Sequence, residues 1–125
     1  MVKARMFYPM DYVQVERWGY NRDVKAPPLA LLPSTGFIVD DVACGFVYLT
    51  NSAIGILEGF IANPDADKND RSEALDSITL KLMELAEING CKVLKCETKL
   101  DAIVNRAKDF GFKELVGFKT LIKEL

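Results

Sequence analysis

Apolar residues form a nearly continuous run over residues 54–62, interrupted only by Glu58 and two glycines. A run of this kind predicts a strand buried on both faces, which places it in the centre of a sheet. An acidic turn at residues 63–69 follows the strand. Beyond the turn, apolar residues recur at three- and four-residue steps, which predicts a long amphipathic helix from about residue 70 to residue 89. The residues on its apolar face are Ala74, Leu75, Ile78, Leu82, Leu85 and Ala86.

Both ends of this helix carry capping signals. Asp70 is predicted as the N-cap because Glu73 follows it three residues later, as in a capping box. Gly90 lies where a glycine commonly ends a helix. The helix is therefore expected to begin at an acidic residue and to stop at a glycine.

The same periodicities predict the remaining elements. Short strands are expected at residues 2–8, 37–39, 42–50, 92–97, 112–116 and 118–125, and shorter helices at 11–20 and from 98 or 99 to 110. Prolines within residues 21–33 predict an ordered but irregular segment. Strand 92–97 follows a strand and a crossover helix, so it should lie parallel to strand 54–62. This order predicts one α/β (α+β) domain over residues 1–125, with a mixed central sheet of about six to seven strands and three to four helices.

Composition restricts the chemistry that this domain can carry out. The chain of 125 residues contains no histidine, which excludes Ser-His and Cys-His nucleophiles and most zinc sites, so no metal is expected. Its three widely spaced cysteines argue against a disulfide framework and fit a reducing, cytoplasmic location. A net charge of −2 gives no reason to expect nucleic-acid binding. No apolar run reaches the length of about 18 residues that a membrane span needs.

One segment carries a resemblance to a known family. Residues 57–64 read Leu-Glu-Gly-Phe-Ile-Ala-Asn-Pro, an Ala74-Leu75 pair follows on the helix, and the later helix ends in Phe110-Gly111-Phe112. Together with the order of elements, these residues resemble the GNAT superfamily of N-acetyltransferases. Many members have a strand ending in apolar-x-Asp/Asn-Pro, a turn of Arg/Gln-x-x-Gly-x-Gly/Ala and an Ala-Leu pair in the helix. The spacing from Pro64 to the Ala-Leu pair matches without insertion.

The resemblance implies a cofactor, acetyl-CoA, and a place for it. In the family, the strand before the turn separates from the next parallel strand, and the gap admits the pantetheine arm. Carried over, Phe60, Ile61 and Ala62 would line that arm. The phosphate loop would consist of Lys68, Asn69, Asp70, Arg71 and Ser72. Glu58 matches a position where some members place a carboxylate that deprotonates the acceptor amine through water.

The sequence also departs from the family pattern. The Arg/Gln position is Asp67, and the two glycines are replaced by Asp70 and Ser72. Carboxylates beside a pyrophosphate would repel it by about 1 kcal/mol or more each at short range. In the later helix, Leu100 stands where the family has an asparagine, and Ala107 stands in place of its catalytic tyrosine.

Each candidate residue also has a structural interpretation. Glu58 is a general base or a carboxylate facing water, and Lys68 and Arg71 bind phosphates or form a solvated helix start. Cys96 is better explained as a packed thiol than as a nucleophile. Tyr48 and Tyr8 are better explained by aromatic packing than as substitute acids. An acceptor wall, a partner-binding patch and simple core are equally compatible with Trp18, Tyr20, Leu29, Leu31 and Leu32.

Two functions follow from the sequence. The first is an acetyl-CoA-dependent N-acetyltransferase that acts on an amine of a small molecule or a protein. The second is a catalytically inactive GNAT-fold binding or assembly module, a reduced form that fits compact genomes such as those of viruses. Chains of this family often pair through late strands, so residues 118–125 are a candidate homodimer contact.

Overall fold

The computed structural model describes residues 3–20, 26–98 and 101–125, with only the backbone of Tyr20. Its core is a five-stranded sheet in the order β1-β2-β3-β4-β5. The strands are β1 (Arg5–Met6), β2 (Gly36–Val39), β3 (Ala43–Leu49), β4 (Ile54–Ala62) and β5 (Val93–Cys96). Successive strands from β1 to β4 pair antiparallel, whereas β5 pairs parallel with β4, which confirms the predicted crossover.

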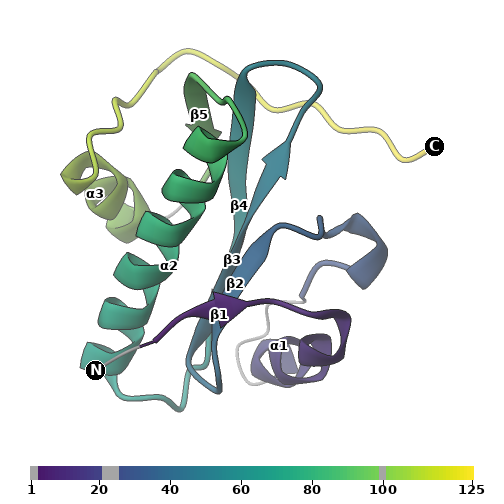
Figure 1. Cartoon of the computed structure of the whole chain (residues 1–125), viewed down its shortest axis with the longest axis vertical. Helices are drawn as coiled ribbons and strands as arrows, with labels where there is room; N and C mark the ends of the chain where they lie inside the picture. Colours follow the sequence, from purple (N-terminus) through teal and green to yellow (C-terminus); the bar gives the residue numbers. More distant parts are fainter. Residues whose placement is uncertain (1–2, 21–25, 99–100) are drawn as a thin grey trace.

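Helices cover both faces of this sheet (Figure 1). The α-helices are α1 (Tyr12–Tyr20), α2 (Lys68–Ile88) and α3 (Asp101–Asp109). Two short 3-10 helices, η1 (Pro9–Asp11) and η2 (Leu29–Leu31), flank α1 and the proline-rich segment. In Figure 1, α2 runs along the length of the sheet with α3 beside it, and α1 lies on the opposite side.

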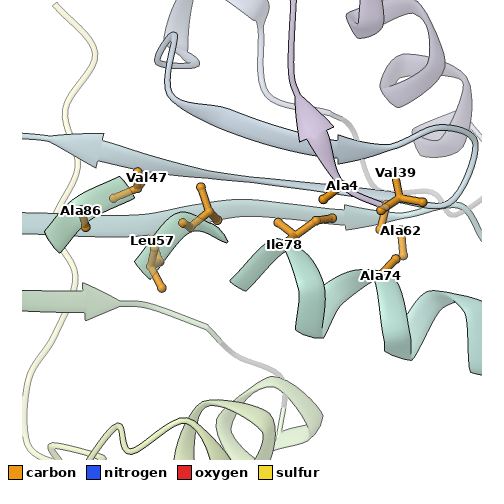
Figure 2. Packing of buried hydrophobic residues seen from close by; sticks show 10 residues of the cluster. Ala4, Val39, Val47, Leu57, Ala62, Ala74, Ile78 and Ala86 are labelled. Carbon is orange, nitrogen blue, oxygen red and sulfur yellow. The ribbon is translucent and has the colours of Figure 1, made fainter. Parts of the chain in front are cut away.

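The alternation of side chains along the strands builds two apolar clusters, one on each face. On the α2 face, Ile78 and Leu82 are fully buried against Val47 and Leu57 of the sheet. Figure 2 shows Ala74 and Ile78 directed from α2 towards the strands. Burial of each of the larger side chains contributes about 1.5–3 kcal/mol. The cluster on the α1 face consists of Phe7, Val15, Trp18, Ile38, Cys44 and Phe46.

The predicted start of α2 is wrong by three residues. Asp67, not Asp70, is the N-cap, because its side chain accepts hydrogen bonds from the backbone amides of Asn69 (2.8 Å) and Asp70 (3.4 Å). Asp70 is already within the first turn, so the capping box with Glu73 does not form. At the other end the prediction is confirmed, since Gly90 adopts a φ of +85° directly after the C-cap Asn89.

The final two strands are also predicted wrongly. The residues from 112 to 125 form no strand, so the sheet has five strands instead of six to seven. Phe118, Leu121 and Ile122 are 80–93% exposed. A strand forms only where a ladder of hydrogen bonds and a buried face are both provided, and beyond Phe112, which packs against the core, the described segment has neither.

Candidate functional site

Strands β4 and β5 separate halfway along β4. The parallel ladder joins Ile54 to Val93 and ends at Leu57, which pairs with Cys96. Beyond that point β4 continues to Ala62, paired only with β3. Among the described residues, no strand pairs with the β5-facing edge of β4 from Glu58 onward.

A bulge in β4 lies at the start of this free edge. Between the pairs Cys44–Ile61 and Phe46–Glu58, β4 has one more residue than β3, and Gly59 there has a φ of +74°. Glycine supports this conformation without strain, as in bulges that begin with a left-handed residue. The extra residue places the side chains of Leu57 and Phe60 on the same face of the sheet, since both pack on the α2 side. The bulge thus directs the Phe60 ring towards α2.

A cavity of about 310 Å³ lies on this face, beside the separation of β4 and β5. Its walls come from β4, β5, α3 and the first turns of α2. The apolar lining consists of Leu57, Phe60, Ala62, Leu75, Cys96, Ile103, Ala107, Phe110 and Phe112. The polar lining consists of Lys68, Arg71, Ser72, Thr79 and Arg106. A mostly apolar cavity with a few convergent polar groups is typical of a small-molecule or cofactor site.

The structure brings together part of the predicted site. Phe60 and Ala62 of the expected pantetheine wall line the cavity, as do Lys68, Arg71 and Ser72 of the expected phosphate loop. Four other predicted residues do not line it: the predicted base Glu58 and three residues of the expected cofactor site. Ile61 packs against the cluster on the α1 face, and Asn69 and Asp70 are exposed on the outside of the first turn of α2.

Glu58 is exposed, although the sequence predicts a strand buried on both faces. It follows the last residue of β4 that pairs with β5, so it stands where the two strands part. Its charge, together with burial, raises the pKa of Tyr48 on the α1 face and the pKa of Cys96 in the cavity wall. In both groups burial is the larger cause. Glu58 does not line the cavity. Because successive strand residues alternate, it lies on the face of the sheet opposite Leu57, at the point where β4 and β5 part.

Arg106 is a site residue that sequence reasoning did not identify. It lies on α3, and its Nη1 donates to the carbonyl oxygen of Ser72 (3.2 Å) and to the carboxylate of Asp76. Its Nη2 lies 3.3 Å from Ser72 Oγ. The available signal was its spacing, since Arg106 follows Ile103 by three residues and so lies on the same side of the helix as this apolar residue.

The cavity lining is positively charged. Among the described residues, Lys68, Arg71 and Arg106 line it and no carboxylate does. Arg71 donates to the carbonyl oxygen of Pro64 (3.3 Å), and neither Arg71 nor Lys68 forms an ion pair within the described chain. Such a lining favours an anionic group on whatever ligand the cavity takes.

The amides at the start of α2 are not free. The carboxylate of Asp67 accepts from Asn69 N and Asp70 N, which are two of the donors that a phosphate at a helix N-terminus would use. An anion that binds there must displace a side chain that is covalently part of the turn. This arrangement shifts the capacity to bind an anion from the backbone to the cationic side chains.

The remaining candidates are structural or peripheral. Burial raises the pKa of the Cys44 thiol to about 12, and all three cysteines are free. Burial also raises the pKa of Cys96, which keeps this thiol protonated near neutral pH and supports a packing role. Tyr48 donates its hydroxyl to the carbonyl oxygen of Leu31 (2.9 Å), and Tyr8 is exposed at the surface.

The proposed acceptor wall is not one surface. Trp18 is a core residue that is only 1% exposed, whereas Leu29 and Leu31 are exposed on η2. Leu32 packs against the cluster that contains Trp18. The side chain of Tyr20 and the whole of Leu100 lie outside the described residues. Ala107 lines the cavity without a hydroxyl that could act as an acid.

No helix in residues 3–20, 26–98 or 101–125 is long and apolar enough to cross a membrane. Within those ranges, no three His, Cys, Asp or Glu side chains gather into a group that could hold a metal ion.

Comparison with solved structures relates this architecture to acetyltransferases. AAC(6')-Iy in complex with the bisubstrate analogue CoA-S-monomethyl-acetylneamine matches with a TM-score of 0.66 and 13% identity, over 100% of this chain and 99% of that chain. An acetyltransferase from Trypanosoma brucei matches with a TM-score of 0.64 and 13% identity, over the whole of both chains. The aminoglycoside 6'-N-acetyltransferase AAC(6')-IG from Acinetobacter haemolyticus matches with a TM-score of 0.60 and 16% identity, over 98% of this chain and 99% of that chain. No protein-family model and no curated protein sequence matches the chain.

Proposed function

We propose that this chain, which has the GNAT-like fold of those acetyltransferases, is an acetyl-CoA-dependent N-acetyltransferase that acts on an amine. The observation that carries the proposal is the cavity at the separation of β4 and β5. The free edge of β4 offers backbone N–H and C=O groups beside it, and such groups need partners. A pantetheine arm, which carries two amides on an otherwise apolar chain, fits an apolar cavity bordered by a strand edge.

The residues of the cavity support the same ligand. Phe60 and Ala62 provide apolar contact for the arm, and Lys68, Arg71 and Arg106 provide positive charge for the phosphates. The Asp67 carboxylate opposes the phosphates, so the fit is good for the arm and weaker at the turn.

Bound acetyl-CoA would supply a thioester, whose acetyl group passes to the amine nitrogen as the C–S bond breaks and the CoA thiol is released. Glu58 takes the proton that the amine loses, through a water molecule, because its carboxylate is exposed at the point where β4 and β5 part. No phenol is present at Ala107, so the thiolate of the leaving group takes its proton from solvent.

Calorimetry with acetyl-CoA and with CoA tests the proposal. We expect both to bind with a dissociation constant well below millimolar. If neither binds below millimolar, the enzyme function is to be abandoned.

The role of Glu58 needs its own test, with an aminoglycoside as the first acceptor because similar structures are aminoglycoside acetyltransferases. Glu58→Gln should lower the rate of CoA release by about 10²-fold, the usual effect of losing a general base, and leave CoA affinity unchanged. Glu97→Gln is the matched control, since Glu97 is an exposed carboxylate just after β5. Equal rates for the two variants would remove Glu58 from the mechanism.

A second candidate is a binding or assembly module that keeps this fold without using acetyl-CoA. The observation that favours it is the Asp67 carboxylate on the amides of α2, where a phosphate would otherwise bind. The calorimetric titration separates the two functions, because the module binds neither acetyl-CoA nor CoA.

A further inference from the structure

We propose that Arg106 is a phosphate-binding residue of the cavity, so that side-chain cations from α2 and α3 hold the anionic part of the ligand in place of helix amides. This inference rests on the proposed use of a CoA-type ligand and adds the means by which its phosphates are recognised. It assigns a binding role to α3, the helix in which Ala107 stands in place of the family's catalytic tyrosine.

The backbone amides that would usually donate to a phosphate at the start of α2 are already occupied. Asp67 already accepts hydrogen bonds from Asn69 N and Asp70 N at 2.8 and 3.4 Å. A phosphate at the same place would lie close to the Asp67 carboxylate, and the two negative charges would repel each other. The ligand's phosphates therefore need donors on another side of the first turn of α2.

Arg106 lines the same cavity as two cations of α2. Arg106 contacts Ser72 through both the backbone carbonyl (3.2 Å) and the hydroxyl (3.3 Å). Lys68 precedes Ser72 by four residues, so the two lie on the same side of α2. Arg71 lines the same cavity. Three cations thus converge from two helices on a space whose described lining contains no carboxylate.

The guanidinium of Arg106 also has more N–H donors than its present partners use fully. A guanidinium carries five N–H donors, and two of the partners of Arg106 are neutral oxygens of Ser72 at long range. Among the described residues its ionic partner is Asp76, whose side chain is half-exposed, and a pair with one half-exposed partner is weaker than a fully buried one. Asp76 holds the guanidinium at the cavity wall without saturating it. A phosphate offers a stronger, charge-assisted acceptor than a serine oxygen.

The test is a set of calorimetric titrations with CoA, dephospho-CoA, pantetheine and inorganic pyrophosphate. Arg106→Gln should weaken CoA about 10-fold or more and leave pantetheine, which has no phosphate, unchanged. Arg106→Lys keeps the charge and should lie between wild type and Arg106→Gln. The loss of affinity for dephospho-CoA in Arg106→Gln shows whether Arg106 contacts the diphosphate or the phosphate that dephospho-CoA lacks.

Two further variants separate a phosphate contact from a structural tie between α2 and α3. Asp76→Asn should keep or tighten CoA affinity, because it removes a competing carboxylate and frees the guanidinium. Lys108→Gln is the matched control, since Lys108 is a half-exposed cation of α3 that pairs with Glu114 and does not line the cavity. It should change none of the affinities.

The outcomes distinguish this inference from the proposed function. If CoA binds to wild type and Arg106→Gln weakens CoA and pantetheine equally, or weakens neither, Arg106 is not a phosphate contact and the proposed function still stands. If only pyrophosphate binds, and Arg106→Gln abolishes it, the phosphate site stands and the CoA function falls. If wild type binds neither CoA nor pyrophosphate, both the phosphate-binding role of Arg106 and the proposed function are wrong.

Discussion

Arg5 and Arg106 both join elements that are distant in the sequence, but their surroundings differ. All three guanidinium nitrogens of Arg5 are engaged by charged or backbone acceptors: Asp11 by a bidentate pair at 2.7 and 2.9 Å, Asp40 at 2.6 and 3.0 Å, and the Met6 carbonyl at 3.0 Å. Arg106 has one exposed carboxylate partner and one serine. Two carboxylates oppose the charge of Arg5, whereas Arg106 adds to the charges of two other cations.

The difference separates a structural arginine from a binding one. The carboxylate of Asp11 is 5% exposed and also accepts from Tyr8 N, so Arg5 completes a partly buried network that joins β1, η1 and the β2–β3 turn. Completed networks of this kind stabilise a fold and have no capacity left for a ligand. The cluster of Lys68, Arg71 and Arg106 has the opposite character, because it has positive charge in excess of its partners.

The largest effect expected from this comparison is on stability. Arg5→Gln should lower the free energy of unfolding by about 2 kcal/mol, because it leaves the nearly buried Asp11 without its ionic partner. Arg106→Gln should lower it by less, about 1 kcal/mol, since the side chain of its partner Asp76 is half-exposed. Urea unfolding of the two variants measures both values. Equal losses would mean that Arg106 is as structural as Arg5.

A somewhat smaller effect is expected from acid. The hydrogen bonds from Arg5 hold the pKa of Asp11 and the pKa of Asp40 below their usual range. A lowered pKa in the folded state stabilises the fold above the unfolded pKa of about 3.9, and this stability is lost as pH falls through the folded pKa. Wild type should therefore lose stability as the pH drops below about 4.

The same measurement on Arg5→Gln provides the control for the acid effect. Without the guanidinium, the two carboxylates titrate closer to their unfolded values, so the acid-dependent part of the stability should shrink. Thermal melts between pH 7 and pH 3 follow it. If wild type and Arg5→Gln lose stability in parallel, other carboxylates cause the acid dependence.

The sequence predicts the fold well where the determinants are local. The pattern from β4 through the acidic turn to α2 is encoded by an apolar run, a proline and a helical periodicity that all lie within 35 residues. The N-cap is displaced because Asp67 and Asp70 are both capable caps, and only backbone geometry selects one of them. The prediction of the final strands is wrong because Leu121 and Ile122 are apolar but exposed, and no described strand pairs with them.

The candidate site divides in the same way. Phe60, Lys68 and Arg71, which flank one turn of the chain, were expected from the family resemblance, and the structure places all three in the cavity lining. Arg106 could not be predicted, because its contact with Ser72 spans 34 residues and depends on how α3 docks against α2. A pattern within α3 shows which side is apolar, but only the tertiary arrangement shows that an arginine on that side faces other cations.

The smallest effect concerns the acidic turn, where carboxylates reduce the positive excess around the cavity. The double variant Asp67→Gln with Asp70→Gly should tighten CoA about fivefold, because it removes two like charges near the phosphates and releases amides that Asp67 now occupies. It should also cost about 1 kcal/mol of stability, through loss of the N-cap and the added glycine.

Glu84→Gln, which removes an exposed carboxylate farther along α2, is the matched control and should leave affinity unchanged. Calorimetry with CoA compares the three proteins, and a double variant with wild-type affinity would show that the turn is not part of the phosphate site. Because the expected gain is smaller than the loss from Arg106→Gln, the two results together would place recognition of the phosphates mainly on side chains and only secondarily on the helix start.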